Sequence, residues 1–203
     1  ILSRYKDIIK KNLGKNFKKK SPHPLTITYV VGGAGAEKDI GIKIANSLKE
    51  KIIKGNVIVN LAVGTRLDVK SYFEENLKNI GMEKEINKNI SIIFALDKKT
   101  YFSTLNNVLH KTDILWTKPS ELSFYTALGL PIIIAPPVGS HENFNKEWLE
   151  HIGSGFVQEK PEFVNDWLFY WLENGRLAQA AWEGFAEAPS LGAYNVEKVV
   201  FKG

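Results

Sequence analysis

The stretch that decides the fold is DILWTKPSELS at residues 113–123, which continues through LGLP at 128–131 to PPVGSHEN at 136–143. Its pattern is that of a short apolar strand, a polar turn, a helix, a second apolar strand and a polar loop. In an open parallel sheet, both polar segments would follow the carboxyl ends of strands, where such sheets bind ligands. We therefore expect a ligand site in these two segments, with the rest of the chain as its scaffold.

Apolar runs alternate with helical patterns on both sides of this stretch. Strands are expected at residues 25–31, 57–63, 90–96, 114–116, 132–135 and 155–157, with helices between them and a helical, aromatic C-terminal part. Strands that alternate with helices at this spacing predict a parallel sheet with right-handed crossovers. The prediction is an α/β fold: one Rossmann-like domain over residues 25–203, with about six parallel strands flanked by helices.

The overall composition is that of an ordinary globular protein, with 44% apolar and 24% charged residues among 203. No run is long enough to span a bilayer, and no signal peptide opens the chain. The absence of cysteine excludes disulfides and thiolate metal sites. Because the four histidines (His23, His110, His141 and His151) lack ligand spacing, we expect neither a metal nor a cofactor.

The net charge of +5 is concentrated at the beginning of the chain. Residues 1–20 hold eight basic groups and one acid, a net +7, which leaves −2 for all the others. Because the body is slightly acidic, we expect no nucleic-acid partner. The chain also opens without Met and inside a periodic pattern, as a fragment of a longer protein would.

Residues 1–24 are predicted to form a basic amphipathic helix followed by a proline linker, since apolar residues recur between the lysines at near-helical spacing. This helix either packs on the domain with a solvated basic face or lies on an anionic membrane surface. We therefore expect a cytoplasmic protein, peripheral at the membrane under the second interpretation.

A glycine-rich turn, GGAGA at residues 32–36, follows the first predicted strand and precedes a helical pattern. Unpaired N–H groups at the start of a helix bind anions, and glycine lets the backbone approach a ligand closely. The turn lacks the Lys-Ser/Thr of a P-loop and is not a complete G-x-G-x-x-G motif. By itself it is equally compatible with a tight turn that needs small residues.

Three loops are expected to meet at the carboxyl edge of the sheet. They offer backbone donors, hydroxyls, a cation, carboxylates and an imidazole, which together suit a nucleotide diphosphate. The candidate binding residues are Gly32, Gly33, Ala34, Gly35, Thr117, Lys118, Ser120, Glu121, Gly139, Ser140, His141, Glu142 and Asn143.

Ordinary structural roles stay open for several of these side chains. Ser120 and Glu121 also suit the start of any helix, as a cap and as a partner of the helix dipole. Lys118 and His141 could be solvated surface groups. Arg66, after a Gly-Thr turn, could reach a phosphate, although we expect it to be a surface arginine. No residue is assigned as a catalytic base.

The order GGAGA at 32–36, TKPSE at 117–121, GLP at 129–131 and PPVGSHENFN at 136–145 resembles the C-terminal, donor-binding half of GT-B glycosyltransferases. The resemblance is to the peptidoglycan N-acetylglucosaminyltransferase and monogalactosyldiacylglycerol synthase type, and it spans residues 25–200. It implies that the first loop approaches the diphosphate of a UDP-sugar and that Thr117–Glu121 lies at the diphosphate and ribose. It also implies that His141–Asn143 contacts the donor sugar and that Leu96 and Asp97 lie near the base of the nucleotide.

The sequence departs from this family at several positions. Ala34 replaces a serine, and Lys118-Pro119-Ser120 replaces a glycine-rich turn. No acid is present at Phe124 and Tyr125, where the resemblance places the ribose-binding glutamate. Only one sheet's worth of strands is present, so the resemblance implies an N-terminal GT-B domain in cis or in trans, which would supply the acceptor site and the catalytic base.

Two functions follow from these observations. The first is a glycosyltransferase-like domain that binds a nucleotide-diphosphate sugar, with UDP-sugar favoured, for transfer to an acceptor. The alternative is a non-catalytic GT-B-like binding or scaffold module. A Rossmann oxidoreductase is disfavoured because no acid follows the second predicted strand, between Asn60 and Thr65, to bind a ribose.

Overall fold

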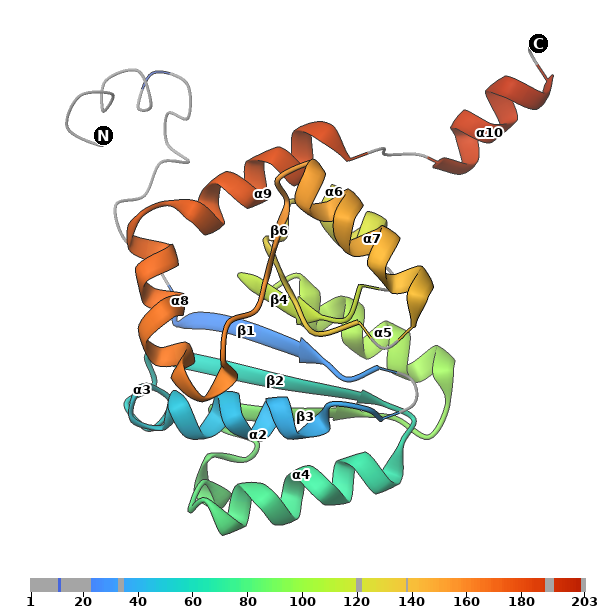
Figure 1. Cartoon of the computed structure of the whole chain (residues 1–203). Coiled ribbons are helices and arrows are strands. Elements are labelled where there is room, and N and C mark those ends of the chain that lie inside the picture. The colour runs from blue at the N-terminus through green and yellow to red at the C-terminus, as the bar shows by residue number, and fades with distance from the viewer. Residues whose placement is uncertain are drawn as a thin grey trace.

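Six parallel strands form the centre of the part of the chain that the structure describes (Figure 1). This computed structural model describes residue 11 and residues 23–32, 35–119, 122–137, 139–188 and 192–201. The strands run in the order β3-β2-β1-β4-β5-β6. Their bounds are Leu25–Val30 (β1), Val57–Gly64 (β2), Ile90–Phe94 (β3), Ile114–Thr117 (β4), Ile132–Ile134 (β5) and Gly155–Val157 (β6). The α/β prediction with about six parallel strands is confirmed.

Helices cover both faces of the sheet, and each face has its own hydrophobic core. One core packs β1 and β2 against α2 (Lys38–Ser47), α3 (Lys49–Ile53), α4 (Leu67–Asn79) and α8 (Val164–Glu173). The other packs β4 and β5 against α5 (Lys98–Leu109), α6 (Leu122–Ala127) and α7 (Ser140–His151). The central strands are therefore apolar on both sides, as parallel strands in such folds are.

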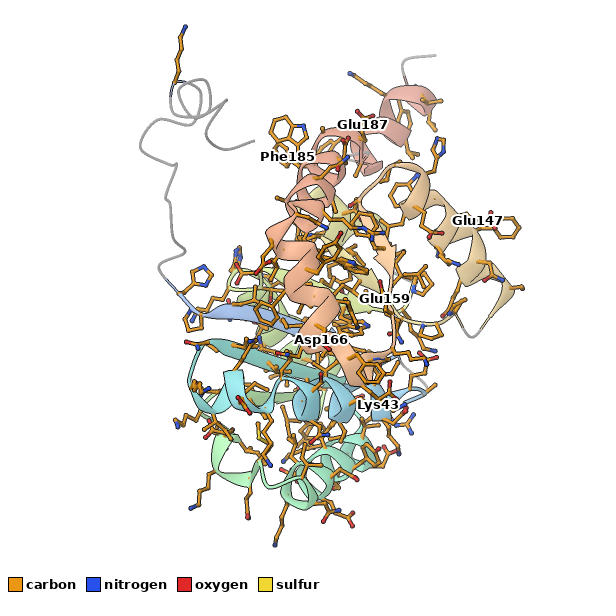
Figure 2. The ribbon with its side chains drawn as sticks, turned by 60° about the vertical axis from the view of Figure 1, so that its left-hand side comes forward. Lys43, Glu147, Glu159, Asp166, Phe185 and Glu187 are labelled. Atoms are coloured by element: carbon orange, nitrogen blue, oxygen red, sulfur yellow. The ribbon has the colours of Figure 1, made fainter. Side chains whose placement is uncertain are left out.

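The C-terminal part is helical, as expected. After α8, α9 (Arg176–Glu187) packs against α6 and α8, and α10 (Gly192–Phe201) ends the described chain. Figure 2 shows α8 and α9 in front of the sheet, with Lys43 of α2 near the lower end of α8 in this view. The Lys43 ammonium forms ion pairs with Asp39 and with Glu162, at 3.0 and 3.1 Å, so that it ties α2 to the short helix before α8 (Pro161–Phe163).

The strand register brings four carboxyl ends to one edge of the sheet. Val30 at the end of β1 pairs with Ala62 of β2 and with Thr117 of β4, and Thr117 pairs with Ile134 of β5. Connections leave in opposite directions from β1 and β4, so the reversal of strand order lies between these two strands. Open α/β sheets bind ligands at such a reversal.

The third strand is shorter than the sequence indicates. It ends at Phe94, and Leu96, predicted to be in the strand, is 87% exposed. The side chain of Asp97 accepts a hydrogen bond of 2.9 Å from the Thr100 N–H and so caps α5, which begins at Lys98.

Apart from Lys11, His23 and Pro24, the predicted basic helix and proline linker (1–24) lie outside the described residues. None of the helices in the described ranges is both long enough and apolar enough to cross a lipid bilayer.

Candidate functional site

A cavity of about 390 Å³ lies at the carboxyl ends of β1, β2 and β4. Its walls include Gly32 from the first loop, Thr117 and Lys118 after β4, Arg66 after β2, and Tyr101 of α5. The arrowheads of β1 and β2 in Figure 1 point to this edge. The edge therefore carries a cavity where the sequence predicted a ligand.

A larger cavity, of about 530 Å³, opens on the α5 face toward the amino ends of the strands. Asn60 and Thr26 lie on its floor, and the charged and titratable groups around it (His23, His110 and Lys111) are exposed. The carboxyl-edge cavity is the better candidate because it alone of the two is lined by a buried charged side chain.

Gly32 and Lys118, which lie 86 positions apart in the sequence, are in direct contact. A Cβ atom on Gly32 would lie 2.9 Å from Cδ and 3.2 Å from Cε of Lys118, so any larger residue would push the lysine aside. The absence of a side chain at Gly32 thus leaves room for the lysine. The structure brings these two predicted site residues together.

Lys118 is a buried cation. It is 7% exposed, and within the described part of the chain its ammonium group has no hydrogen bond or ion pair. Burial of an unpaired charge is costly, so that such groups normally pair with an opposite charge. The alternative of a solvated surface lysine is therefore wrong, and the side chain is suited to an anionic ligand.

Two more cations border the same cavity, Arg66 and Lys98. The Arg66 guanidinium donates two hydrogen bonds of 2.9 Å to Asp68, which lowers the pKa of that carboxyl to about 2. A Cβ on Gly35, which has a φ of 72°, would lie 3.6 Å from Nη2 of Arg66, so the arginine lies beside the first loop. The Arg66 side chain is 42% exposed, as expected for a surface arginine, and it also borders the cavity. Its place directly after β2, the neighbour of β1, was the available signal.

Glu37, which the sequence analysis did not select, lies next to Lys118. It precedes α2 in a left-handed conformation (φ 63°, ψ 21°), and the Tyr29 hydroxyl donates a 2.7 Å hydrogen bond to its carbonyl oxygen. Burial raises the pKa of the Glu37 carboxyl; Lys118 opposes this, while Asp39 and Glu142 add to it. Glu37 is thus close enough to Lys118 and to Glu142 to interact electrostatically with each of them. An acid directly after the GGAGA turn was the only sequence signal.

The third predicted loop is joined to the second by a hydrogen bond. The Asn145 side chain of α7 donates to the Pro119 carbonyl at 2.9 Å. Glu142, in the first turn of α7, is 8% exposed. Gly139 precedes the helix, while Ser140 and Asn143 are exposed and do not line the described cavity. The structure therefore brings Glu142 within electrostatic reach of Glu37, but Glu142, Ser140 and Asn143 do not line the cavity.

Several candidates cannot be placed. Gly33, Ala34, Ser120 and Glu121 lie outside the described residues, as does the side chain of His141. At the position of the family's ribose glutamate, Phe124 is 58% exposed and Tyr125 is buried in the cavity wall. No group of three or more His, Asp or Glu side chains in the described ranges is arranged to hold a metal ion.

Solved structures with the same architecture include glycosyltransferases and epimerases. WaaG, a glycosyltransferase involved in lipopolysaccharide biosynthesis, matches with a TM-score of 0.57 at 16% identity over 97% of this chain and 51% of its own. The UDP-GlcNAc 2-epimerase from Neisseria meningitidis, bound to UDP-GlcNAc, matches with a TM-score of 0.55 at 14% identity, over 100% of this chain and 51% of its own. The C-terminal domain of the group 1 glycosyltransferase LpcC from Francisella tularensis matches with a TM-score of 0.51 at 18% identity, over 83% of this chain and 86% of its own.

These matches show the fold: the chain has the architecture of one Rossmann half of a GT-B glycosyltransferase or UDP-GlcNAc 2-epimerase. It spans about half the length of the first two proteins. No curated protein matches the chain. A family model described as "Domain of unknown function (DUF6938)" matches residues 81–201, more than half of the sequence. The chain therefore belongs to the DUF6938 family, which in this protein has a GT-B-like Rossmann fold.

Proposed function

We propose that this domain binds a nucleotide-diphosphate sugar, with UDP-sugar favoured, at the carboxyl edge of its sheet. The observation that carries the proposal is Lys118, a lysine that is 7% exposed, lines the cavity and has no ion pair among the described residues. A diphosphate would accept charge-assisted hydrogen bonds from the lysine, which are about twice as strong as neutral ones.

The other groups at the edge suit the remaining parts of such a ligand. Arg66 and Lys98 add positive charge for the diphosphate, and Tyr101 and Tyr125 offer ring surfaces in the same cavity. Gly32, which lines the same cavity without a side chain, would let a phosphate approach the backbone closely. Two of the matched structures support this choice, since one is bound to UDP-GlcNAc and another to UDP.

In a transfer reaction, the bond between the anomeric carbon and the nucleotide oxygen breaks as the acceptor oxygen forms its own bond to that carbon. Lys118 and Arg66 would stabilise the negative charge on the departing diphosphate. The acceptor would lose its proton to a base from another domain, since the chain spans only half of the matched enzymes. We propose that an N-terminal GT-B domain supplies this base in cis or in trans, as in the peptidoglycan-transferase and galactolipid-synthase type.

A second candidate function is binding without transfer. It is favoured by one specific observation: the exposed Phe124 occupies the position where the resemblance places the ribose-binding glutamate. A domain of this kind would bind the nucleotide sugar as a scaffold. Release of UDP from a UDP-sugar by the full-length protein, measured with an acceptor extract, supports transfer; its absence alongside measurable binding supports the scaffold.

The binding proposal is tested by calorimetric titration of UDP into the wild type, Lys118→Met and Lys78→Met. Lys78 is an exposed lysine on α4 and serves as the control. We expect Lys118→Met to weaken UDP binding at least tenfold, about 1.4 kcal/mol, and Lys78→Met to leave it unchanged. Equal affinity in Lys118→Met, or no binding of UDP by the wild type at millimolar concentration, would contradict the proposal.

A further inference from the structure

The cavity of about 530 Å³ on the α5 face has no role in the proposed function. It lies between α5 and the amino-terminal halves of β1, β2 and β3. α5 packs on β2 and β3 at this face, and the proposed nucleotide site uses the other end of the helix, at Lys98 and Tyr101. Among the described residues, the two cavities share no lining residue. The larger one is therefore a separate feature of the fold.

A row of polar side chains crosses the sheet and ends in this cavity. Thr28 of β1 is paired with Asn60 of β2, and Asn60 is paired with Ser91 of β3, so the three side chains lie side by side on one face. The row begins in the core, where the Thr28 hydroxyl bonds the Thr112 hydroxyl at 2.7 Å. Its other two members, Asn60 and Ser91, line the cavity.

Asn60 is buried with half of its amide unused. The side chain is 7% exposed, and its Nδ2 donates a hydrogen bond of 3.2 Å to the Thr28 hydroxyl. Within the described ranges, no group donates a hydrogen bond to the amide oxygen Oδ1. A buried acceptor without a donor is costly, and native proteins normally supply one. Because Asn60 lines the cavity, a ligand with an N–H or O–H group can supply it there.

The rest of the cavity changes in character from its walls to its mouth. Ile58, Ile93 and Val108 form apolar walls between the polar floor and the solvent. His110 and Lys111, which follow directly after α5, are exposed and line the same cavity. A ligand that fits all three zones has a hydrogen-bond donor at its inner end, an apolar body and a negative charge at its outer end.

We propose that this cavity is a second binding site, specific for a small organic acid. The inner amide or hydroxyl group of the ligand would donate to Oδ1 of Asn60, its body would lie against the apolar walls, and its carboxylate would face Lys111. The basic beginning of the chain is a poorer occupant: residues 1–20 carry a net +7 and would be repelled by Lys111. The inference is independent of the proposed nucleotide site.

The test uses three matched probes. 4-Acetamidobenzoate has an amide donor, a flat apolar body and a carboxylate at opposite ends. 4-Propylbenzoate replaces the acetamido group by an alkyl chain of similar size, and 4-acetamidobenzamide replaces the carboxylate by a neutral group. Each is titrated into protein with labelled isoleucine methyl groups. Shifts at Ile58 and Ile93 report the cavity, and Ile44, in the core on the opposite face, is the internal control.

At millimolar concentration, 4-acetamidobenzoate should give saturable shifts at Ile58 and Ile93 and none at Ile44. 4-Propylbenzoate should bind about fivefold more weakly, as for one lost hydrogen bond. 4-Acetamidobenzamide should bind about two- to fivefold more weakly, as for one exposed ion pair.

Two variants separate the floor from the mouth. Ser91→Leu fills the inner end and should abolish the shifts at Ile93. Lys111→Gln changes an exposed side chain, so it keeps the fold, and it should weaken the benzoate about two- to fivefold but not the benzamide. Lys99→Gln, at an exposed position of α5 away from the cavity, should change neither.

The absence of saturable shifts with every probe overturns the inference, and so does displacement of the probe by UDP. Equal affinity for 4-propylbenzoate would show that Asn60 does not recognise the ligand and would overturn it as well. The same holds if Lys111→Gln leaves the benzoate affinity unchanged.

Discussion

At the scale of single residues, Lys118 has different expected effects on ligand binding and on stability. Its side chain is 7% exposed and forms no ion pair within the described ranges, while Glu37 is in electrostatic reach, so we expect the charge to contribute little to the stability of the free protein. We predict that Lys118→Met unfolds at the same or a higher urea concentration than the wild type. Lys49→Met is the matched comparison, because the Lys49 ammonium donates a 2.6 Å hydrogen bond to the Ile80 carbonyl.

The Lys49 variant should lose about 1 kcal/mol of unfolding free energy, as for a typical lost hydrogen bond, and keep its UDP affinity. If Lys118→Met proved the less stable of the two variants, Lys118 would be a structural residue. The site assignment would then lose its main support.

A second residue-scale prediction concerns pH. Burial, with smaller contributions from Asp39 and Glu142 against Lys118, raises the pKa of Glu37 above its ordinary value of 4.5. The stability that this group contributes is therefore fully present below pH 4.5 and is lost as pH rises through its raised pKa in the folded state. Glu37→Gln cannot ionise. We expect it to melt at a higher temperature than the wild type at pH 8 and at nearly the same temperature at pH 4.

Thermal melts of both proteins between pH 4 and 8 check this expectation, with Glu75→Gln as the exposed control. The difference in melting temperature between Glu37→Gln and the wild type is the quantity to compare. If this difference were more negative at pH 8 than at pH 4, the carboxylate would stabilise the free protein. Glu37 would then be a structural partner of Lys118.

The candidate site was predictable from the sequence only in part, and single residues show why. Gly32 and Lys118 belong to recognisable segments that follow strands, so the sheet topology brings them together. Glu37, Arg66 and Lys98 are equally close to the site, but their roles depend on the left-handed turn at Glu37 and on how α2 and α5 begin. Such features arise from tertiary packing, which local patterns do not encode.

At the scale of secondary-structure elements, the contact between α6 and α9 depends on a glycine. A Cβ on Gly184 of α9 would overlap the Ser154 hydroxyl and lie 3.0 Å from the Thr126 carbonyl oxygen. Gly→Ala normally stabilises a helix by about 1 kcal/mol, whereas overpacking costs about 1–3 kcal/mol. We predict that Gly184→Ala destabilises the domain in chemical denaturation and leaves UDP affinity unchanged.

Ala186→Gly, at an exposed position of the same helix, calibrates the propensity effect. It should cost about 1 kcal/mol. A stabilising Gly184→Ala substitution would show that α9 can move away from α6 without cost, and that the close contact is not required.

The elements themselves were largely predictable, because alternating apolar runs and helical patterns specify a parallel α/β sheet. The ends of the elements were less predictable than the elements themselves. β3 ends at Phe94 because Asp97 caps the next helix, and the strand preference of Leu96 does not outweigh that cap. Polar residues on β1 and β2 were also unexpected. Thr28 and Asn60 are buried there because the Thr28 hydroxyl bonds Thr112 at 2.7 Å and Asn60 at 3.2 Å.

At the scale of the whole molecule, the proposed function depends on one edge of one sheet. Three loops that are far apart in the sequence meet where β1, β4 and β5 end, and the cations lie around a cavity at that edge. The chain spans about half the length of WaaG and of the Neisseria epimerase. Under the proposed function, this edge binds the donor, and the partner domain supplies the acceptor site and the catalytic base.

The most direct test of this central claim is a crystal structure of the domain with UDP at saturating concentration. The account predicts diphosphate oxygens within about 3 Å of the Lys118 ammonium group, beside Gly32 and the turn that follows it. UDP bound in the cavity between α5 and the amino ends of the strands would contradict the account, as would the absence of bound UDP from the carboxyl edge.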